Sequence, residues 1–244
     1  MREETNRVDC QLVVPCFRES KRLPSFLSDL LSTLKACRHQ VNTVVVDDGS
    51  GPAEQLATRS IVESSALRFG IACHFLALET NRGKGGAIRE GWDAAGEDVR
   101  MLAFIDADGS VAAATFVSLL DRALSEDDET VVTSSRRLPE SHAHRSLWRR
   151  ALSSVFYALV ELRYGLGLTD TQCGCKIVSC SFYRRVASLL RQNGFGFDIE
   201  LLRHAKALGV SIRELPIAWT ERPGSTVTAR DAVALYANVI FRRY

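Results

Sequence analysis

The chain has 244 residues, of which 46% are hydrophobic and 25% are charged, and these ordinary globular proportions exclude a disordered, collagen-like or low-complexity protein. Its net charge of +2 is unevenly spread, because residues 1–135 hold 14 Lys/Arg against 21 Asp/Glu and residues 136–244 hold 17 against 8. The positive second half suits an anionic partner, and nucleic acid, an anionic membrane surface and a phosphorylated acceptor all fit that charge.

Strand-like and helical segments alternate through the first 135 residues. A helical face over residues 23–34 and a glycine-rich loop that opens a helix at 81–95 lie between apolar, strand-like runs. This alternation predicts an α/β fold with a Rossmann-like, mostly parallel sheet flanked by helices. The predicted strands cover residues 10–16, 43–46, 71–78, 101–105 and 130–134.

Acidic side chains follow several of these strands. Glu19 comes after the first strand, Asp47 and Asp48 after the second, and Asp106 and Asp108 after the strand at 101–105. Since ligands of parallel sheets bind beyond the carboxyl ends of the strands, we expect these groups to share one site.

The second half has a weaker pattern. An amphipathic helix is expected over residues 146–164, whose apolar stripe fits either the core or a membrane interface. A second amphipathic helix is expected over 229–244. With no linker or repeat, we expect one compact domain over 1–244: a half at 10–135 that holds the acidic strand ends, a basic half at 136–228 and the terminal helix at 229–244.

Cysteine usage and the first residues favour a cytoplasmic protein. Seven scattered cysteines without a CxxC pair are typical of reduced thiols, and they argue against a disulfide framework or a zinc site. The sequence has no signal-peptide segment and no apolar run near the roughly 18 residues of a membrane span. A cytoplasmic protein, peripheral on the membrane at most, is expected.

Three motifs each allow two interpretations. The Asp106-Ala-Asp108 triplet suits a divalent cation that bridges phosphate oxygens, and it also suits a solvated turn. Lys84 in the glycine-rich loop is placed for a diphosphate or simply begins a helix, since the loop matches neither the Walker A nor the GxGxxG pattern. Arg136 and Arg149 belong to a basic cluster that fits phosphate or a solvated face.

Taken in order, these segments resemble the family 2 glycosyltransferases, and among them the polyprenyl-phosphate sugar synthases. The resemblance covers about residues 10–228 and favours the dolichyl-phosphate β-glucosyltransferase branch over the mannosyltransferase branch. The segments that carry it begin at Val14 (VPCFRE), Val46 (VDDGS), Asn81 (NRGKG), Asp106 (DADG), Asp170 (DTQCGCK), Phe197 (FDIELL) and Trp219 (WTERPGS).

The resemblance implies a GT-A fold, a nucleotide-sugar donor, Mg²⁺ or Mn²⁺, and inversion at the anomeric carbon. It places Lys84 near the nucleotide, Asp106 near the donor ribose or sugar, and Asp108, together with Asp106, on the metal. Two further groups follow from it: a nucleobase and ribose pocket of Pro15, Phe17, Glu19 and Asp48, and an acceptor group of Arg136, Arg149, Ser153, Gln172 and Asp198.

The expected reaction is transfer of a hexose from a nucleotide sugar to a polyprenyl phosphate, with UDP-glucose favoured over GDP-mannose as donor and no nucleic acid partner. A polyprenyl phosphate is already an anionic nucleophile, so positioning would replace a strong general base. The same donor with a soluble hydroxyl or phosphate acceptor is an alternative. A nucleotide-sugar or anionic-lipid binding module is the non-enzymatic alternative.

Overall fold

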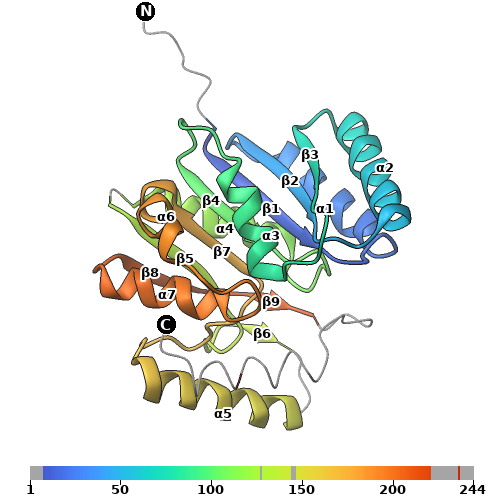
Figure 1. Cartoon of the computed structure of the whole chain (residues 1–244). Coiled ribbons are helices and arrows are strands. Elements are labelled where there is room, and N and C mark those ends of the chain that lie inside the picture. Colours follow the sequence, from blue (N-terminus) through green and yellow to red (C-terminus); the bar gives the residue numbers. More distant parts are fainter. Residues whose placement is uncertain (1–7, 127, 144–146, 221–235, 237–244) are drawn as a thin grey trace, which may run out of the picture.

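The computed structural model describes residues 8–126, 128–143, 147–220 and 236. A seven-stranded sheet runs through its centre, with helices on both faces (Figure 1). The elements of the first half are β1 (Cys10–Cys16), α1 (Leu23–Lys35), β2 (Val41–Asp47), α2 (Pro52–Phe69), β3 (Cys73–Ala77), α3 (Lys84–Asp93), β4 (Met101–Ile105), α4 (Ala113–Leu124) and β5 (Thr130–Ser135).

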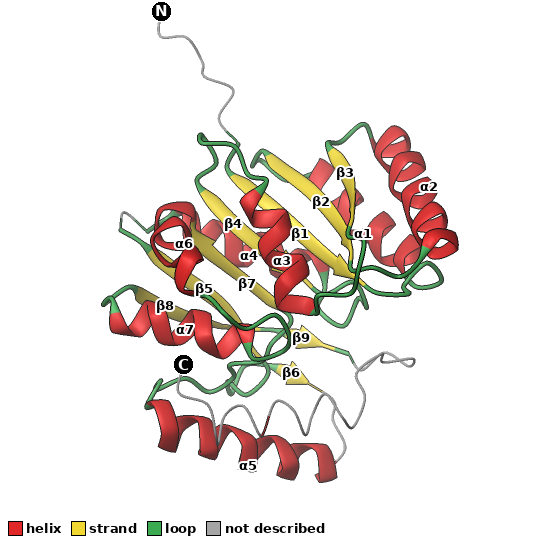
Figure 2. Ribbon diagram, viewed as in Figure 1, coloured by secondary structure: helices red, strands yellow, loops and turns green. Residues whose placement is uncertain are grey.

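The elements of the second half complete the sheet and add a small two-stranded ribbon (Figure 2). They are β6 (His142–Ala143), α5 (Leu147–Tyr164), β7 (Cys175–Ser179), α6 (Cys180–Val186), the short 3₁₀ helix η1 (Ala187–Leu189), α7 (Phe197–Ala207), β8 (Ser211–Pro216) and β9 (Ala218–Trp219).

The strand order of the main sheet is β3-β2-β1-β4-β7-β5-β8. All neighbouring strands are parallel except β7, which runs antiparallel to both β4 and β5. The expected mostly parallel sheet is therefore confirmed. The carboxyl ends of β1, β2 and β4 meet at one edge, as parallel neighbours must.

Alternating side chains of the strands divide the core between the two faces of the sheet. Leu12 and Val14 of β1 pack on one face with the leucine-rich side of α1, whereas Val13 points to the other face. The second face is covered by α3, α5, α6 and α7, with Trp92 at its centre. Trp92 donates its indole N–H to the carbonyl of Ala103 at 2.9 Å, which fixes α3 against β4.

The strand β7 was not predicted, and its composition explains why. Its sequence is CKIVS, so a lysine interrupts an apolar run that is too short to indicate a strand by periodicity. All five residues are nevertheless buried, because β7 lies in the interior of the sheet between β4 and β5. This antiparallel insertion brings residues from the second half of the chain beside β4.

Helix α5 confirms the amphipathic helix expected at 146–164. Phe156, Tyr157 and Val160 are buried in the core, whereas Val155 and Leu162 are 56% and 86% exposed. In the described part of the chain, no helix is both long enough and apolar enough to cross a membrane. The helix expected at 229–244 lies outside the described residues except for Tyr236, as do residues 221–225 of the last motif.

Candidate active site

The acidic residues predicted from the strand ends come together at the carboxyl edge of the sheet. Cys16 pairs with Asp47 at the end of β1 and β2, and Asp106 directly follows β4 on the other side of β1. The loops after β1, β2 and β4 therefore form one surface, as the topology predicted. Residues of the loop between β3 and α3 reach the same surface.

Lys84 is the first residue of α3 and forms an ion pair with Asp106. Its Nζ lies 2.8 Å from Oδ1 of Asp106 and 4.7 Å from the centre of the Phe104 ring. Burial opposes the charged form of Lys84, but the neighbouring carboxylates of Asp106 and Asp198 outweigh this and raise its pKa above the ordinary value. An ammonium group is thus held at a helix N-terminus, where backbone N–H groups also attract anions.

Asp48 holds the loop that leads to Lys84. Its Oδ1 accepts the backbone N–H of Arg82 at 2.7 Å, and its Oδ2 accepts that of Gly83 at 2.8 Å. Gly49 has φ +68°, and a Cβ on it would lie 2.4 Å from the backbone of Asn81, so only glycine allows these two loops to touch. Asp48 was expected in a nucleobase pocket; the structure places its carboxylate on the backbone of the Lys84 loop.

Asp106 is fixed by a second segment, the loop before β7. Its backbone N–H donates to the carbonyl of Gly174 at 2.9 Å. A Cβ on Gly174 would lie 2.2 Å from Oδ2 of Asp106, so the carboxylate occupies the space that the side chain of any other residue at position 174 would need. About a third of the Asp106 side chain, 34%, remains exposed to solvent.

Asp108 lies two residues further on, half-buried, and its Oδ1 accepts the backbone N–H of Ser110 at 2.8 Å. Across the described residues, no cluster of three or more His, Cys, Asp or Glu side chains could hold a metal on its own. Two neighbouring carboxylates nevertheless fit a hard cation that takes its other ligands from phosphate oxygens and water. The donor set thus fits Mg²⁺ or Mn²⁺ bound jointly with a diphosphate.

The three remaining residues of the predicted nucleobase and ribose pocket lie at or just after the end of β1. Pro15 and Phe17 are half-buried, and the guanidinium of Arg18 lies 5.0 Å from the centre of the Phe17 ring. Glu19 is buried and forms an ion pair with Arg22 at the start of α1. The structure therefore brings Pro15 and Phe17 to the site edge, while the Glu19 carboxylate is engaged with α1.

Arg136 follows β5 and is bound to a buried carboxylate. Its Nε and terminal nitrogen lie 2.6 and 2.9 Å from the two oxygens of Asp170, and its backbone N–H donates to the same group at 3.1 Å. The Tyr157 hydroxyl from α5 also donates to Asp170. Burial alone would raise the pKa of Asp170, but the charge and hydrogen bonds of Arg136 hold it below the usual range.

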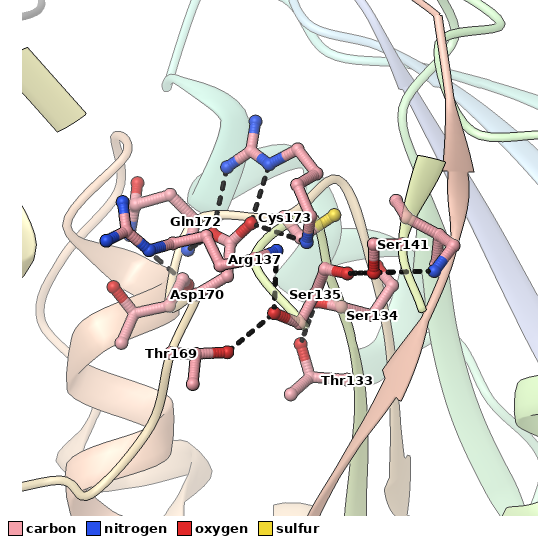
Figure 3. A network of polar contacts seen from close by, with 12 residues as sticks. Thr133, Ser134, Ser135, Arg137, Ser141, Thr169, Asp170, Gln172 and Cys173 are labelled. Carbon is pink, nitrogen blue, oxygen red and sulfur yellow. Dashed lines mark hydrogen bonds and ion pairs between the residues drawn. The ribbon is translucent and has the colours of Figure 1, made fainter. Parts of the chain in front are cut away.

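A wider polar network supports this pair (Figure 3). Glu214 on β8 accepts the backbone N–H groups of Thr169 and Asp170, each at 2.9 Å. The Ser135 hydroxyl lies 2.7 Å from that of Thr169, which joins the end of β5 to the same loop. The network thus fixes residues 169–173, the segment that continues to Gly174 and Asp106.

The other predicted acceptor residues are distributed unevenly. Gln172 is half-buried in the loop fixed by the network, and Asp198 is 1% exposed at the start of α7. Ser153 lies half-buried on α5. Arg149 belongs to α5, but its side chain lies outside what the structure describes.

Four residues that shape the site were not among the predicted site residues: Lys176, Asp170, Tyr157 and Glu214. Lys176 is fully buried on β7, with its Nζ 2.6 Å from Oδ1 of Asp198. A lysine within a short apolar run was the available signal, because buried lysines are rare unless they are paired. Asp170 begins the DTQCGCK motif that Lys176 ends, and this motif was a second signal for both residues. Tyr157 and Glu214 have no local signal, since their partners are distant in the sequence.

Cysteine chemistry is disfavoured at this edge. Burial raises the pKa of the Cys173 and Cys175 thiols, so both stay protonated near neutral pH. Neither is prepared as a nucleophile, which agrees with a direct transfer between two bound substrates.

The model of the family described as "Glycosyl transferase family 2" matches residues 11–189. The chain belongs to this family. It is therefore a nucleotide-sugar-dependent glycosyltransferase, as the motifs indicated. The dolichyl-phosphate beta-glucosyltransferase of Drosophila melanogaster is 33% identical to it over 93% of this chain and 71% of the relative. The human protein of that name is also 33% identical, over 88% of this chain and 68% of the relative.

Solved structures confirm the GT-A fold of this transferase. Glucosyl-3-phosphoglycerate synthase from Mycobacterium tuberculosis in complex with phosphoglyceric acid has a TM-score of 0.67 and 21% identity, over 96% of this chain and 78% of that one. The same synthase in complex with Mn²⁺, UDP-glucose and phosphoglyceric acid has a TM-score of 0.64 and 20% identity, with the same coverage. At this identity the likeness establishes the fold.

The Asp170–Arg136 pair predicts a large loss of stability when the carboxylate is removed. The substitution Asp170→Asn leaves a buried guanidinium without its counter-charge and should lower the free energy of unfolding by about 3–5 kcal/mol in urea titrations at pH 7. Tyr157→Phe removes the hydroxyl that donates to Asp170 and accepts from Arg136, and it should cost less, about 1.5–3 kcal/mol.

The same pair predicts the pH dependence of that loss. Because the folded-state pKa of Asp170 is depressed, its contribution is present above the unfolded value near 3.9 and is lost as pH falls through the folded value. The difference in unfolding free energy between the unmodified chain and Asp170→Asn should therefore shrink below about pH 4. A difference that stays constant down to pH 3 would contradict the assignment.

Proposed function

We propose that the transferase moves glucose from UDP-glucose to a polyprenyl phosphate, with inversion at the anomeric carbon. The observation that carries this proposal is the Lys84–Asp106 pair at the start of α3, beside Asp108. Relatives named dolichyl-phosphate beta-glucosyltransferase support the acceptor and the sugar. The fold shared with a synthase solved with Mn²⁺ and UDP-glucose supports the donor.

On the donor side, Lys84 would bind the diphosphate and stabilise the charge that develops when UDP leaves, assisted by the positive end of the α3 dipole. The N–H of Gly86 in the first turn of α3 already donates to the carbonyl of Asn193 at 2.9 Å. Asp106 holds the Lys84 ammonium in place and keeps an exposed face toward the donor. Pro15 and Phe17 would contact the nucleoside at the end of β1. Asp48 would act by fixing the loop that carries Lys84, through its bonds to Arg82 and Gly83.

Asp108, together with Asp106, would hold the divalent cation. When bound, Mg²⁺ or Mn²⁺ supplies positive charge that neutralises the leaving diphosphate. Both carboxylates stand on the loop directly after β4, so the rigid strand sets their position relative to Lys84.

Near the site, the described residues offer no available base that could deprotonate a hydroxyl acceptor. This favours a phosphate acceptor. Asp170 and Asp198, the two carboxylates that a hydroxyl acceptor would need for deprotonation, are buried and paired with Arg136 and Lys176. The pKa of Asp170 is also lowered, which weakens it as a base. A polyprenyl phosphate needs no such base, because its oxygen is already charged.

Of the two neighbouring arginines, Arg137 rather than Arg136 would contact the acceptor phosphate. Arg136 is bound by Asp170, whereas the Arg137 side chain is exposed, lies 4.8 Å from the Tyr157 ring centre and donates to the Ser154 hydroxyl at 3.3 Å. Arg149 and Ser153 from α5 would complete the acceptor group.

The exposed apolar side chains on α5 support membrane contact next to the acceptor group. Val155 and Leu162 are 56% and 86% exposed on the helix that also carries Ser153. We propose that this face meets the membrane surface that holds the lipid acceptor.

Transfer of labelled glucose from UDP-glucose into an organic-extractable product, with a short polyprenyl phosphate as acceptor, tests the function. We expect transfer that a chelator abolishes and that Mg²⁺ or Mn²⁺ restores. Asp108→Asn should lower kcat by about 10²–10³-fold, whereas Asp29→Asn on the exposed face of α1 should leave it unchanged. Chelator-sensitive hydrolysis of UDP-glucose without lipid product would contradict the acceptor and retain the donor.

The acceptor assignment predicts a selective change in KM. Arg137→Ala and Arg149→Ala should each raise the acceptor KM by about tenfold or more, because a charge-assisted contact to phosphate is lost, and should change the donor KM little. Arg59→Ala, at an exposed position on α2, is the matched control. Equal effects on both KM values would remove these arginines from the acceptor group.

A further inference from the structure

Two lysines and two aspartates alternate across the carboxyl edge of the sheet. Asp106 lies 2.8 Å from Lys84, Lys84 lies 4.0 Å from Asp198, and Asp198 lies 2.6 Å from Lys176. The inner pair of this series is sealed from solvent, since the side chains of Lys176 and Asp198 are 0% and 2% exposed. Neither can touch a substrate directly.

Lys176 is fixed by the register of β7. It pairs directly with Phe104 of β4, and both ammonium groups lie over that ring, Lys84 at 4.7 Å and Lys176 at 5.6 Å from its centre. Its Nζ also donates to the carbonyl of Cys173 at 3.0 Å. The next residue, Gly174, is the one whose carbonyl accepts the backbone N–H of Asp106.

We propose that Lys176 and Asp198 are a positioning pair that keeps Lys84 on Asp106 and aimed at the donor diphosphate. This inference rests on the proposed function and extends it to two residues that do not reach the substrate. Asp198, which the resemblance placed at the sugar or acceptor, acts here through Lys84.

The physical reason is the balance of buried charge. Lys176 neutralises Asp198, which leaves the Lys84 ammonium to Asp106. Among the described residues, Lys84 and Lys176 form the ion pairs with the buried Asp198 carboxylate, so without Lys176 that carboxylate is left with Lys84. An uncompensated buried charge is strongly unfavourable. Lys84 then moves to Asp198, and the diphosphate loses its ammonium group.

The test compares Lys176→Met with the double variant Lys176→Met/Asp198→Asn. The single variant should lower kcat by about 100-fold, which is the usual loss when a preorganised charge at the reacting group is displaced. The double variant removes the carboxylate that attracts Lys84, so kcat should recover to within about tenfold of the unmodified chain. Lys206→Met, at an exposed position on α7, is the matched control.

Crystal structures of both variants give a readout that does not depend on activity. We expect Lys84 Nζ next to Asp198 in the single variant and back beside Asp106 in the double variant. If Lys176→Met does not fold, Lys176→Gln, which keeps a donor for the Cys173 carbonyl, is compared with Lys176→Gln/Asp198→Asn.

Three results would overturn the proposal: unchanged kcat per folded molecule in the single variant, a double variant as inactive as the single one, or Lys84 still beside Asp106 without Lys176. If the unmodified chain transfers no sugar at all, the proposed function fails. The positions of Lys84 in the variant structures then still decide the role of the pair.

Discussion

The ion pair between Lys84 and Asp106 joins the elements on which the site depends. Lys84 begins α3, and Asp106 directly follows β4, so their 2.8 Å contact fixes a helix N-terminus to a strand end. Burial makes each charge costly unless it is paired, and this requirement extends inward to Asp198 and Lys176. In the proposed function, residues that are almost fully buried thereby set the position of the Lys84 ammonium.

A second buried pair joins other elements of the second half of the chain. Arg136, directly after β5, binds Asp170 on the loop between α5 and β7, and Glu214 holds that loop from β8. The two pairs are not independent, because residues 170–176 contribute to both. One short segment therefore links the two buried pairs, and Gly174 within it leaves room for the Asp106 carboxylate.

The first half of the fold could be predicted because its signals are local. The β1 run and the leucine face of α1 follow from periodicity, and Asp106, Asp108 and Lys84 stand in short motifs at strand and helix ends. In the second half, periodicity predicted the amphipathic helix α5, but it did not predict β7 or the long-range contacts. The antiparallel β7 has no distinctive pattern, and contacts such as Lys84–Asp198 join residues far apart in the chain. Arg136 shows the limit of prediction from local sequence. The basic cluster around it suggests a residue that binds phosphate, but that cluster does not reveal its distant partner Asp170.

We propose that Lys84 is held for a diphosphate, and the affinities of the chain for UDP and for uridine test this role. Calorimetry on the unmodified chain and on Lys84→Met, with Mg²⁺ present, separates the diphosphate contribution from that of the nucleoside. We expect Lys84→Met to weaken UDP binding by about 10–100-fold, because a charge-assisted contact is lost, and to leave uridine binding unchanged. An equal loss for both ligands, or no loss for UDP, would contradict it.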